Sequence, residues 1–268
     1  MSMAPAAPQA PATRALSLGL RAIVLVQCVG LVWTSWVAGT EIETILFGSY
    51  GWPDRLSFLL DRTVAAALLS VAVAGLMLPM RGGYVAMAAW FVAMPMARWS
   101  FGGVPFEELS LPADAVRWAA PLAIALLPAC SFRRAAARDE GAAHEAPIVW
   151  LLRAAIAATF VTHGIEALRQ HPAFVDYLLI ADRRLLGVGL DQASAEQVLR
   201  VIGVVDIACA GALVGLPLRR GLLAYLAFWG VITAGARVMH SGEHGMHEAL
   251  VRAANGGVPA VLWLVAGR

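Results

Sequence analysis

The sequence contains no lysine, and charged side chains of every kind are scarce. Only 14% of the 268 residues are charged, and all 20 basic residues are arginine. Soluble domains carry about 25% charged residues, so this composition argues against a soluble protein. The formal charge of +2 is too small for a nucleic-acid-binding surface, which excludes nucleic acid as a partner.

Cysteine is also rare. The three cysteines, Cys28, Cys130 and Cys209, are far apart and form no Cys-x-x-Cys pair. This spacing argues against a thiol-relay mechanism and against a cysteine metal cluster.

Apolar residues dominate instead, at 60% of the chain, with a mean hydropathy of +0.71. A membrane-spanning helix needs about 20 apolar residues, and the apolar runs show no alternation typical of barrel strands. The sequence therefore predicts an all-α polytopic transmembrane bundle whose lipid-facing backbone is satisfied within helices. The eight predicted spans are 17–39, 63–80, 84–98, 115–130, 148–165, 197–216, 222–238 and 249–266.

The segments between the spans suggest how the chain is organised. Residues 1–16 are rich in alanine and proline and are predicted to be a disordered cytoplasmic tail, because the following apolar run is too long for a cleavable signal. Residues 131–147 form a charged linker, and residues 39–61 and 169–196 are predicted to contain interfacial helices. Arginine-bearing short loops favour both termini in the cytoplasm. The protein is expected to be integral to the bacterial inner membrane.

Two segments of the chain align without a gap. Arg81–Arg98 and Arg220–Arg237 share both terminal arginines, a glycine at the second position, and an equivalent tryptophan, Trp90 or Trp229. Each unit would hold four spans, so both would enter the bilayer from the same side. The sequence thus predicts two tandem four-helix repeats, 17–130 and 148–268, related by an axis along the membrane normal.

The second repeat carries a set of short motifs: an arginine leading to His-Gly, an acid before a glycine-containing span end, and a late acid. In these motifs it resembles the DoxX-like family of four-helix membrane proteins. Ala167 departs from the pattern, because the family generally has lysine there. The matching positions are Arg153, His163, Gly164, Asp206 in place of the usual glutamate, Gly215, Arg219 or Arg220, and Glu248.

The resemblance implies a membrane subunit associated with redox chemistry. The family is associated with quinone-linked thiosulfate oxidation and with partners in thiol and redox homeostasis, so membrane or periplasmic protein partners are expected beside the lipid bilayer. The resemblance does not fix a reaction, and whether the chain is an enzyme stays open.

Ionisable groups at membrane depth are costly and therefore point to function. Asp206 lies about ten apolar residues from either end of its span and must face the bundle interior. His163 lies at a comparable depth in the preceding span, so we expect these two side chains to form a pair that binds a ligand or holds a proton. The alternative is that the pair only joins two helices.

Further polar groups gather on the same side of the predicted membrane. Arg237 and Glu248 are expected to complete the site with His163 and Asp206. The segment with His240, His244 and His247 is interpreted first as a solvated polar loop, and a transition-metal site is the alternative that the histidine spacing permits. Asn255, Gly256, Gly257 and Pro259 are expected to interrupt the final span beside a cavity, while Trp90 and Trp229 are interpreted as core packing.

These patterns lead to one main hypothesis and two alternatives. The chain is predicted to be a subunit or accessory of a redox system that binds a quinone or similar apolar ring near His163, Asp206, Arg237 and Glu248. Haem or a transition metal is a weaker alternative to the quinone. A structural or assembly subunit of a larger membrane complex, or a small-solute transporter, would explain the same sequence without a redox site.

Overall fold

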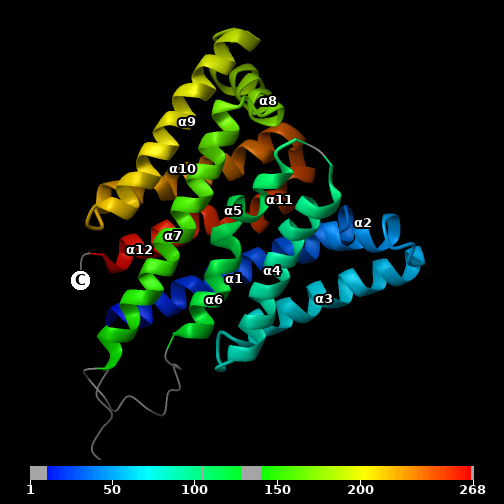
Figure 1. The fold of residues 1–268 in the computed structure, drawn as a ribbon, viewed down its shortest axis with the longest axis vertical. Helices are drawn as coiled ribbons and strands as arrows, with labels where there is room; N and C mark the ends of the chain where they lie inside the picture. Colours follow the sequence, from blue (N-terminus) through cyan, green and yellow to red (C-terminus); the bar gives the residue numbers. More distant parts are fainter. Residues whose placement is uncertain (1–10, 104, 128–139, 267–268) are drawn as a thin grey trace, which may run out of the picture.

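The computed structural model describes residues 11–103, 105–127 and 140–266, and within these ranges it contains helices and no strand. The long helices follow the apolar runs of the sequence, and shorter helical segments connect them (Figure 1). In chain order they are α1 (Pro11–Val37), α2 (Glu41–Gly48), α3 (Asp54–Ala74), α4 (Arg81–Phe101), η1 (Glu107–Leu109), α5 (Ser110–Ala113), α6 (Ala115–Leu126), α7 (Glu140–Leu168), α8 (Pro172–Ala181), η2 (Asp182–Leu186), α9 (Gln192–Gly215), α10 (Arg220–Ser241), η3 (Gly242–Gly245), α11 (Met246–Val251) and α12 (Ala253–Val265).

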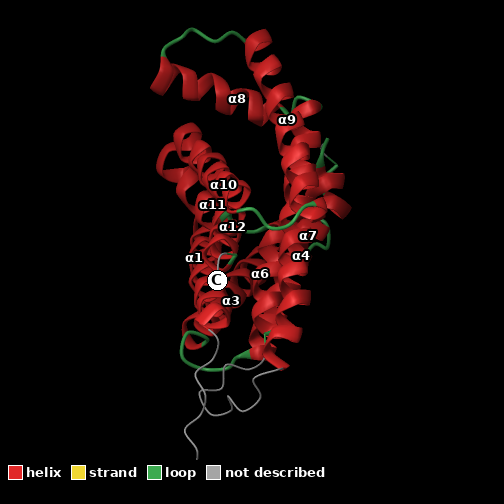
Figure 2. Ribbon diagram, turned by 90° about the vertical axis from the view of Figure 1, so that its left-hand side faces the viewer, coloured by secondary structure: helices red, strands yellow, loops and turns green. Residues whose placement is uncertain are grey.

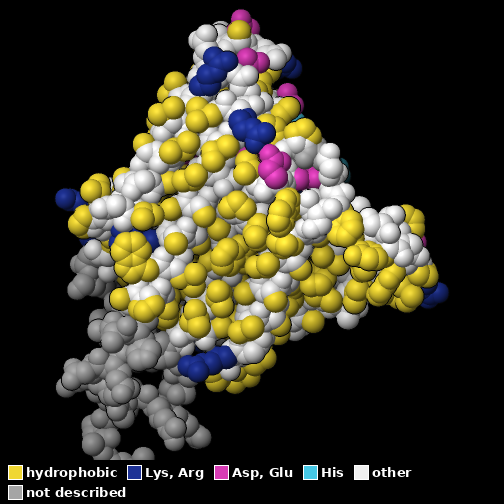
Figure 3. Space-filling view, in the orientation of Figure 1, with side chains coloured by type: hydrophobic (Ala, Val, Ile, Leu, Met, Phe, Trp, Pro, Cys, Tyr) yellow, Lys and Arg dark blue, Asp and Glu magenta, His cyan; other side chains and the backbone are white. Residues whose placement is uncertain are grey.

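Six helical segments of the described chain are long and apolar enough to cross a membrane, rather than the eight predicted. Helix α4 falls outside this group, since glycines and arginines lower its hydropathy. The last predicted span also falls outside, because a break at Arg252 leaves only Ala253–Val265 as an apolar helix. Hydrophobic side chains cover most of the face seen in Figure 3, which fits contact with lipid.

The main helices form two layers that cross one another, seen face-on in Figure 1 and edge-on in Figure 2. One layer has the order α3, α1, α12, α10, and the other has the order α4, α6, α7, α9. The layers touch chiefly through α1, α6, α7 and α12, whereas α9 and α10 make few contacts with each other. The short helices α2 and α8 each bridge the two layers at an end, α2 between α3 and α4 and α8 between α9 and α10.

The halves of the chain are interleaved in this arrangement. Each half contributes one pair of adjacent helices to each layer: α1 with α3 and α4 with α6 from the first half, α7 with α9 and α10 with α12 from the second. An arginine in the first helix of each half caps another helix of that half. Arg21 of α1 donates to the carbonyl oxygen of Gly75 at 2.6 Å, and Arg153 of α7 donates to that of Leu216 at 2.7 Å. Such bonds satisfy carbonyl groups that a helix end leaves free.

Glycine allows the closest helix crossings. A Cβ on Gly203 of α9 would lie 2.7 Å from the carbonyl oxygen of Gly164 in α7, and a Cβ on Gly230 of α10 would lie 2.5 Å from the backbone nitrogen of Gly256 in α12. Small residues at such crossings let helix backbones approach one another in membranes. These two contacts hold the helices that surround the cavity described below.

Several predicted boundaries differ from the structure. Residues 11–16 of the predicted tail belong to α1, where Leu16 is buried in the core. Residues 140–147 of the predicted linker begin α7, while 1–10 and 128–139, with Cys130, lie outside the described residues. The predicted interruption at Asn255 to Pro259 does not occur, because α12 runs through these residues and the chain breaks earlier, at Arg252.

Candidate functional site

A cavity of about 150 Å³ lies between α7, α9 and α10 beneath α8. Its walls are mostly apolar, and α8 contributes the aromatic rings of Phe174 and Tyr177. Three of the four predicted site residues line it: His163 from α7, Asp206 from α9 and Arg237 from α10. The structure therefore brings together groups that are far apart in the sequence.

His163 is held by a neighbour on its own helix rather than by Asp206. Its Nδ1 lies 2.7 Å from Oε2 of Glu166, one helical turn later. The Glu166 residue is buried, with 7% of its surface exposed, whereas the imidazole is half-buried and packs edge-on against Phe174. Because a carboxylate only accepts hydrogen bonds, Nδ1–H donates to Glu166, and Nε2 is the ring atom that faces a ligand.

The expected hydrogen bond between His163 and Asp206 is thus replaced by a different arrangement. Asp206 is 4% exposed, and its Oδ1 has no hydrogen-bond partner. The indole of Trp229 on α10 is a neighbour of this carboxyl group. Trp229 therefore lines the cavity and is not only core packing, whereas the equivalent Trp90 has a buried indole nitrogen without a partner.

Arg237 brings a positive charge to the cavity end nearest α8. It is 8% exposed, donates to the carbonyl oxygen of Thr233 at 2.8 Å, and lies over the ring of Tyr177. Glu248 does not line the cavity, contrary to the prediction. Its carboxylate lies 3.7 Å from Arg237 and 3.6 Å from Arg252, and its side chain is 43% exposed.

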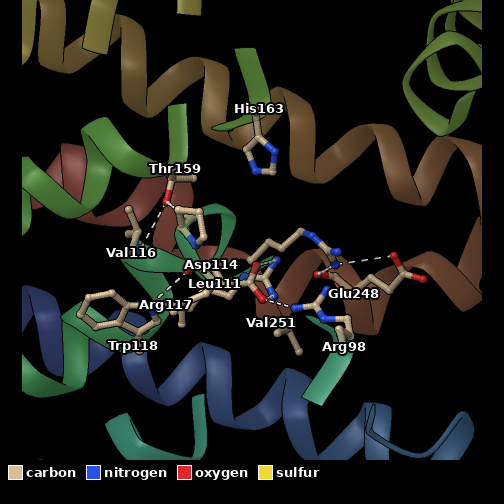
Figure 4. Close-up of polar contacts among 12 residues, drawn as sticks. Arg98, Leu111, Asp114, Val116, Arg117, Trp118, Thr159, His163, Glu248 and Val251 are labelled. Atoms are coloured by element: carbon tan, nitrogen blue, oxygen red, sulfur yellow. Dashed lines mark hydrogen bonds and ion pairs between the residues drawn. The ribbon is translucent and has the colours of Figure 1, made fainter. Parts of the chain in front are cut away.

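A buried ion cluster that the sequence did not reveal lies next to this end of the cavity (Figure 4). Asp114, at the start of α6, forms ion pairs with Arg98 of α4 and with Arg117 one turn later. Asp114 and Arg117 are both less than 5% exposed. In Figure 4 the imidazole of His163 points from its helix toward this cluster. The cluster therefore links the first half of the chain to the surroundings of the cavity.

The three histidines proposed as metal ligands do not share a site. His240 is exposed and lies 3.0 Å from the Ser241 hydroxyl, while His247 is buried and lies 2.9 Å from Oγ1 of Thr34. His244 is exposed in the 3-10 turn between them. Among the residues that the structure describes, no group of three or more His, Cys, Asp or Glu side chains could hold a metal ion.

The cavity borders a surface that is suited to lipid. Val201 and Val204 on α9 are 65% and 59% exposed, and Phe228 and Val231 on α10 are 63% and 64% exposed. Ile232 both lines the cavity and is 41% exposed. Helices α9 and α10 make few contacts with one another beside these exposed side chains.

Glu166 and the Asp114 cluster are the polar groups that sequence reasoning missed. Glu166 follows His163 by three residues, and this spacing places two side chains on the same helical face. That signal was present in the sequence. Asp114 and Arg117 share the same spacing, but their partner Arg98 comes from another helix and could not be assigned without the fold.

No family model, no curated protein and no solved structure matches the chain. The chemistry of the cavity is therefore inferred from its own side chains.

Proposed function

We propose that this chain is an integral protein of the bacterial inner membrane, related to the DoxX-like family, that binds a quinone-type ring in the cavity between α7, α9 and α10. It would act as a subunit or accessory of a redox system, with both termini in the cytoplasm. The observation that carries the proposal is His163, hydrogen-bonded to Glu166, on the wall of an apolar cavity that Asp206 and Arg237 also line.

The size of the cavity suits a single ring. An apolar cavity of about 150 Å³ in another protein binds benzene, and this cavity has the same volume. Phe174 and Trp229 supply flat aromatic walls. A ring bound there would direct an apolar tail between α9 and α10 into the lipid, which is the form that membrane quinones take.

The His163–Glu166 pair supports proton exchange with such a ring. With Nδ1–H donated to Glu166, the free Nε2 accepts a proton from a ring hydroxyl, and the nearby carboxylate stabilises the imidazolium that forms. In the opposite direction the imidazolium returns the proton to a reduced ring oxygen. The electrons would come from a redox partner, so the chain itself needs only to bind the ring and move protons.

Asp206 supports the deeper end of the same site. Its Oδ1 is buried and lacks a partner, and an unpaired buried carboxyl oxygen is costly unless a ligand completes it. A hydroxyl group of the bound ring is a suitable donor to that oxygen. Trp229 lines the cavity beside this carboxyl group.

The tandem-repeat hypothesis draws support from the paired contacts of the two halves. The pairs α1 with α3 and α7 with α9 correspond, as do α4 with α6 and α10 with α12. The equivalent capping roles of Arg21 and Arg153 agree with this correspondence. We therefore propose eight membrane-embedded helices in two repeats, of which the second carries the cavity lined by His163, Asp206 and Arg237.

The proposal is tested by binding a decyl-tailed benzoquinone and its reduced form to the purified protein in lipid nanodiscs. Binding should raise the unfolding temperature, and above the dissociation constant the rise should grow with the logarithm of the ligand concentration. Replacing Asp206 by Asn or His163 by Ala should weaken the apparent affinity at least about ten-fold, which corresponds to about 1.4 kcal/mol. Organic extraction of the protein as purified should also release a quinone.

Asp176→Asn provides the matched control, because it makes the same chemical change at an exposed position of α8 outside the cavity lining. This variant should bind like the wild type. If neither form of the quinone binds, or if both site variants bind as the wild type does, the redox site is wrong. Co-purification with a larger complex would then favour a structural or assembly subunit.

A further inference from the structure

We infer that the cavity selects rings that carry an anionic oxygen, and that Arg237 is the residue that recognises it. This inference rests on the proposed function and specifies the class of ligand: a ring carrying a carboxylate, or a phenol-type ring bound as its oxyanion. The charge and hydrogen-bonding state of Arg237 carry the argument.

Arg237 is buried without a full set of partners. Only 8% of its surface is exposed, and its Nε has no hydrogen-bond partner. The protein gives its guanidinium one hydrogen bond, to the Thr233 carbonyl oxygen, and one aromatic ring, that of Tyr177. A buried guanidinium with unused donors is costly unless an acceptor completes it. Since Arg237 lines the cavity, a ligand in the cavity is placed to supply that acceptor.

The surrounding charges do not neutralise Arg237. Glu248 is the nearest acid, but its 3.7 Å separation is too long for a hydrogen bond, it is shared with Arg252, and its side chain is 43% exposed. Solvent weakens such a pair. Asp114 is already held by Arg98 and Arg117. Arg98 also pairs with Glu41 at 3.2 Å. Arg237 is therefore left with the long, partly exposed pair to Glu248 as its nearest acid.

The two sides of this end complement each other chemically. His163 accepts the proton of an acidic ring hydroxyl at Nε2, and the oxygen that loses the proton keeps the electron pair and becomes an oxyanion. Arg237 then stabilises that oxyanion through charge-assisted hydrogen bonds, which are about twice as strong as neutral ones. A ligand that already carries a carboxylate would gain the same interaction without proton transfer.

The test compares two compounds that differ only in charge, 4-heptylbenzoate and 4-heptylbenzamide. Each is added to the full-length protein in a neutral maltoside detergent, and the concentration that gives the same fixed rise in unfolding temperature is measured for both. The benzoate should act at a roughly ten-fold lower concentration than the amide, because only the benzoate forms the charge-assisted bonds. Equal concentrations for the two compounds would overturn the inference.

Variants test whether Arg237 is responsible for the preference for the benzoate over the benzamide. Arg237→Gln should bring the two concentrations together, whereas Arg184→Gln, an exposed position outside the cavity lining, should keep the wild-type ratio. Arg237→Lys retains a charge and should keep part of the preference, which provides a second variant if the glutamine form does not fold. A wild-type ratio in Arg237→Gln would contradict the assignment.

An anionic lipid headgroup offers the same charge, so phosphatidylglycerol is added in a separate arm. Stabilisation by phosphatidylglycerol together with equal effects of the benzoate and the amide would assign Arg237 to lipid and overturn the inference about rings. This inference can also fail while the proposed quinone binding holds. If the quinone binds through His163 and Asp206 while the benzoate has no advantage over the amide, only the present inference fails.

Discussion

Three buried aspartates of this protein differ in how their carboxyl oxygens are paired. Asp114 pairs with two arginines, Asp61 accepts hydrogen bonds from the backbone and hydroxyl groups of Thr40, and Asp206 keeps one oxygen without a partner. Structural acids are normally fully satisfied. The carboxyl group with an unpaired oxygen, that of Asp206, lines the cavity. We therefore treat Asp206, and not Asp61, as a binding group.

Asp182 illustrates a structural acid outside the membrane-spanning segments, and its behaviour with pH can be predicted. Its carboxylate accepts hydrogen bonds from the backbone nitrogens of Leu190, Val188 and Gly189 at 2.8 to 3.0 Å, and these bonds hold its pKa below the ordinary 3.8. Because the pKa of Asp182 is lower in the folded state, its ionised carboxylate stabilises the folded loop at pH values above its unfolded pKa of about 3.9. This stabilisation is lost as the pH falls through the lower folded-state pKa.

The prediction for Asp182 is tested with trypsin, which cleaves after Arg183 and Arg184. Asp182→Asn should make this segment several-fold more sensitive near neutral pH, because the amide cannot accept all three hydrogen bonds. Asp191→Asn serves for comparison, since its backbone contact is with Ser194 on the following helix. Equal cleavage rates for the wild type and Asp182→Asn would show that these bonds do not hold the loop.

Part of the site could be predicted at the residue scale and part could not. Asp206 was identifiable because an acid amid apolar residues in a long span must face inward, and the depths of His163 and Arg237 placed them near it. The depth of Glu248 did not reveal that its side chain lies beside Arg237 but outside the cavity lining. Both Glu166 and Asp206 were possible partners of His163. The direction of the imidazole decides between them, and this direction is known only from the structure.

The close crossing of α7 and α9 at Gly203 leads to a prediction about the packing of these helices. Gly203→Ala would place a Cβ 2.7 Å from a carbonyl oxygen of α7, and backbone atoms cannot move aside as a flexible side chain does. The helices must separate, so the free energy of unfolding should fall by about 1–3 kcal/mol. Because Asp206 lies one turn away, binding in the cavity should weaken as well. Thermal unfolding in detergent and quinone titration measure both effects.

Gly211 offers a matched control on the same helix. A Cβ at this position meets no atom within 4 Å, so Gly211→Ala should leave binding unchanged. Its stability should equal or exceed that of the wild type by up to about 1 kcal/mol, because alanine favours helix more than glycine does. If the two glycine variants lose stability equally, the close crossing does not explain the role of Gly203.

Hydropathy located the long helices but not how each one ends. The runs that became α1, α3, α7, α9 and α10 were strong enough to predict from composition alone. Helix α12 was predicted to break at Asn255 to Pro259, yet Gly256 is needed inside the helix for its contact with α10, and a turn at Arg252 separates α11 from α12. Such choices depend on packing between helices, which a one-dimensional profile does not contain.

At the scale of the whole molecule, the interleaving of the halves distinguishes this fold from two adjacent bundles. Helix α1 packs on α12 and α6 packs on α7, so each layer is completed by helices from the other half. The repeat could be proposed from the alignment of 81–98 with 220–237, but an alignment does not show how two units pack. Neither half buries its apolar surface without the other.

This interleaving predicts the result of cutting the chain within residues 128–139. The two fragments should assemble and co-purify when they are expressed together, because their contacts are noncovalent and extensive. Each fragment alone should aggregate or be degraded, since it would expose the faces of α1 and α6 or of α7 and α12. Size-exclusion chromatography in detergent measures both results. Two fragments that each behave as folded monomers would contradict it.

The sparse packing between α9 and α10 also has a consequence for how affinity should be measured. A molecule that enters between these helices arrives from the hydrocarbon phase, so its mole fraction in the membrane, rather than its aqueous concentration, determines occupancy. Compounds that partition strongly into lipid would then appear potent even when their intrinsic contacts are weak. Adding lipid at a constant total amount of ligand should lower the occupancy of the cavity, because it lowers the mole fraction of the ligand in the membrane.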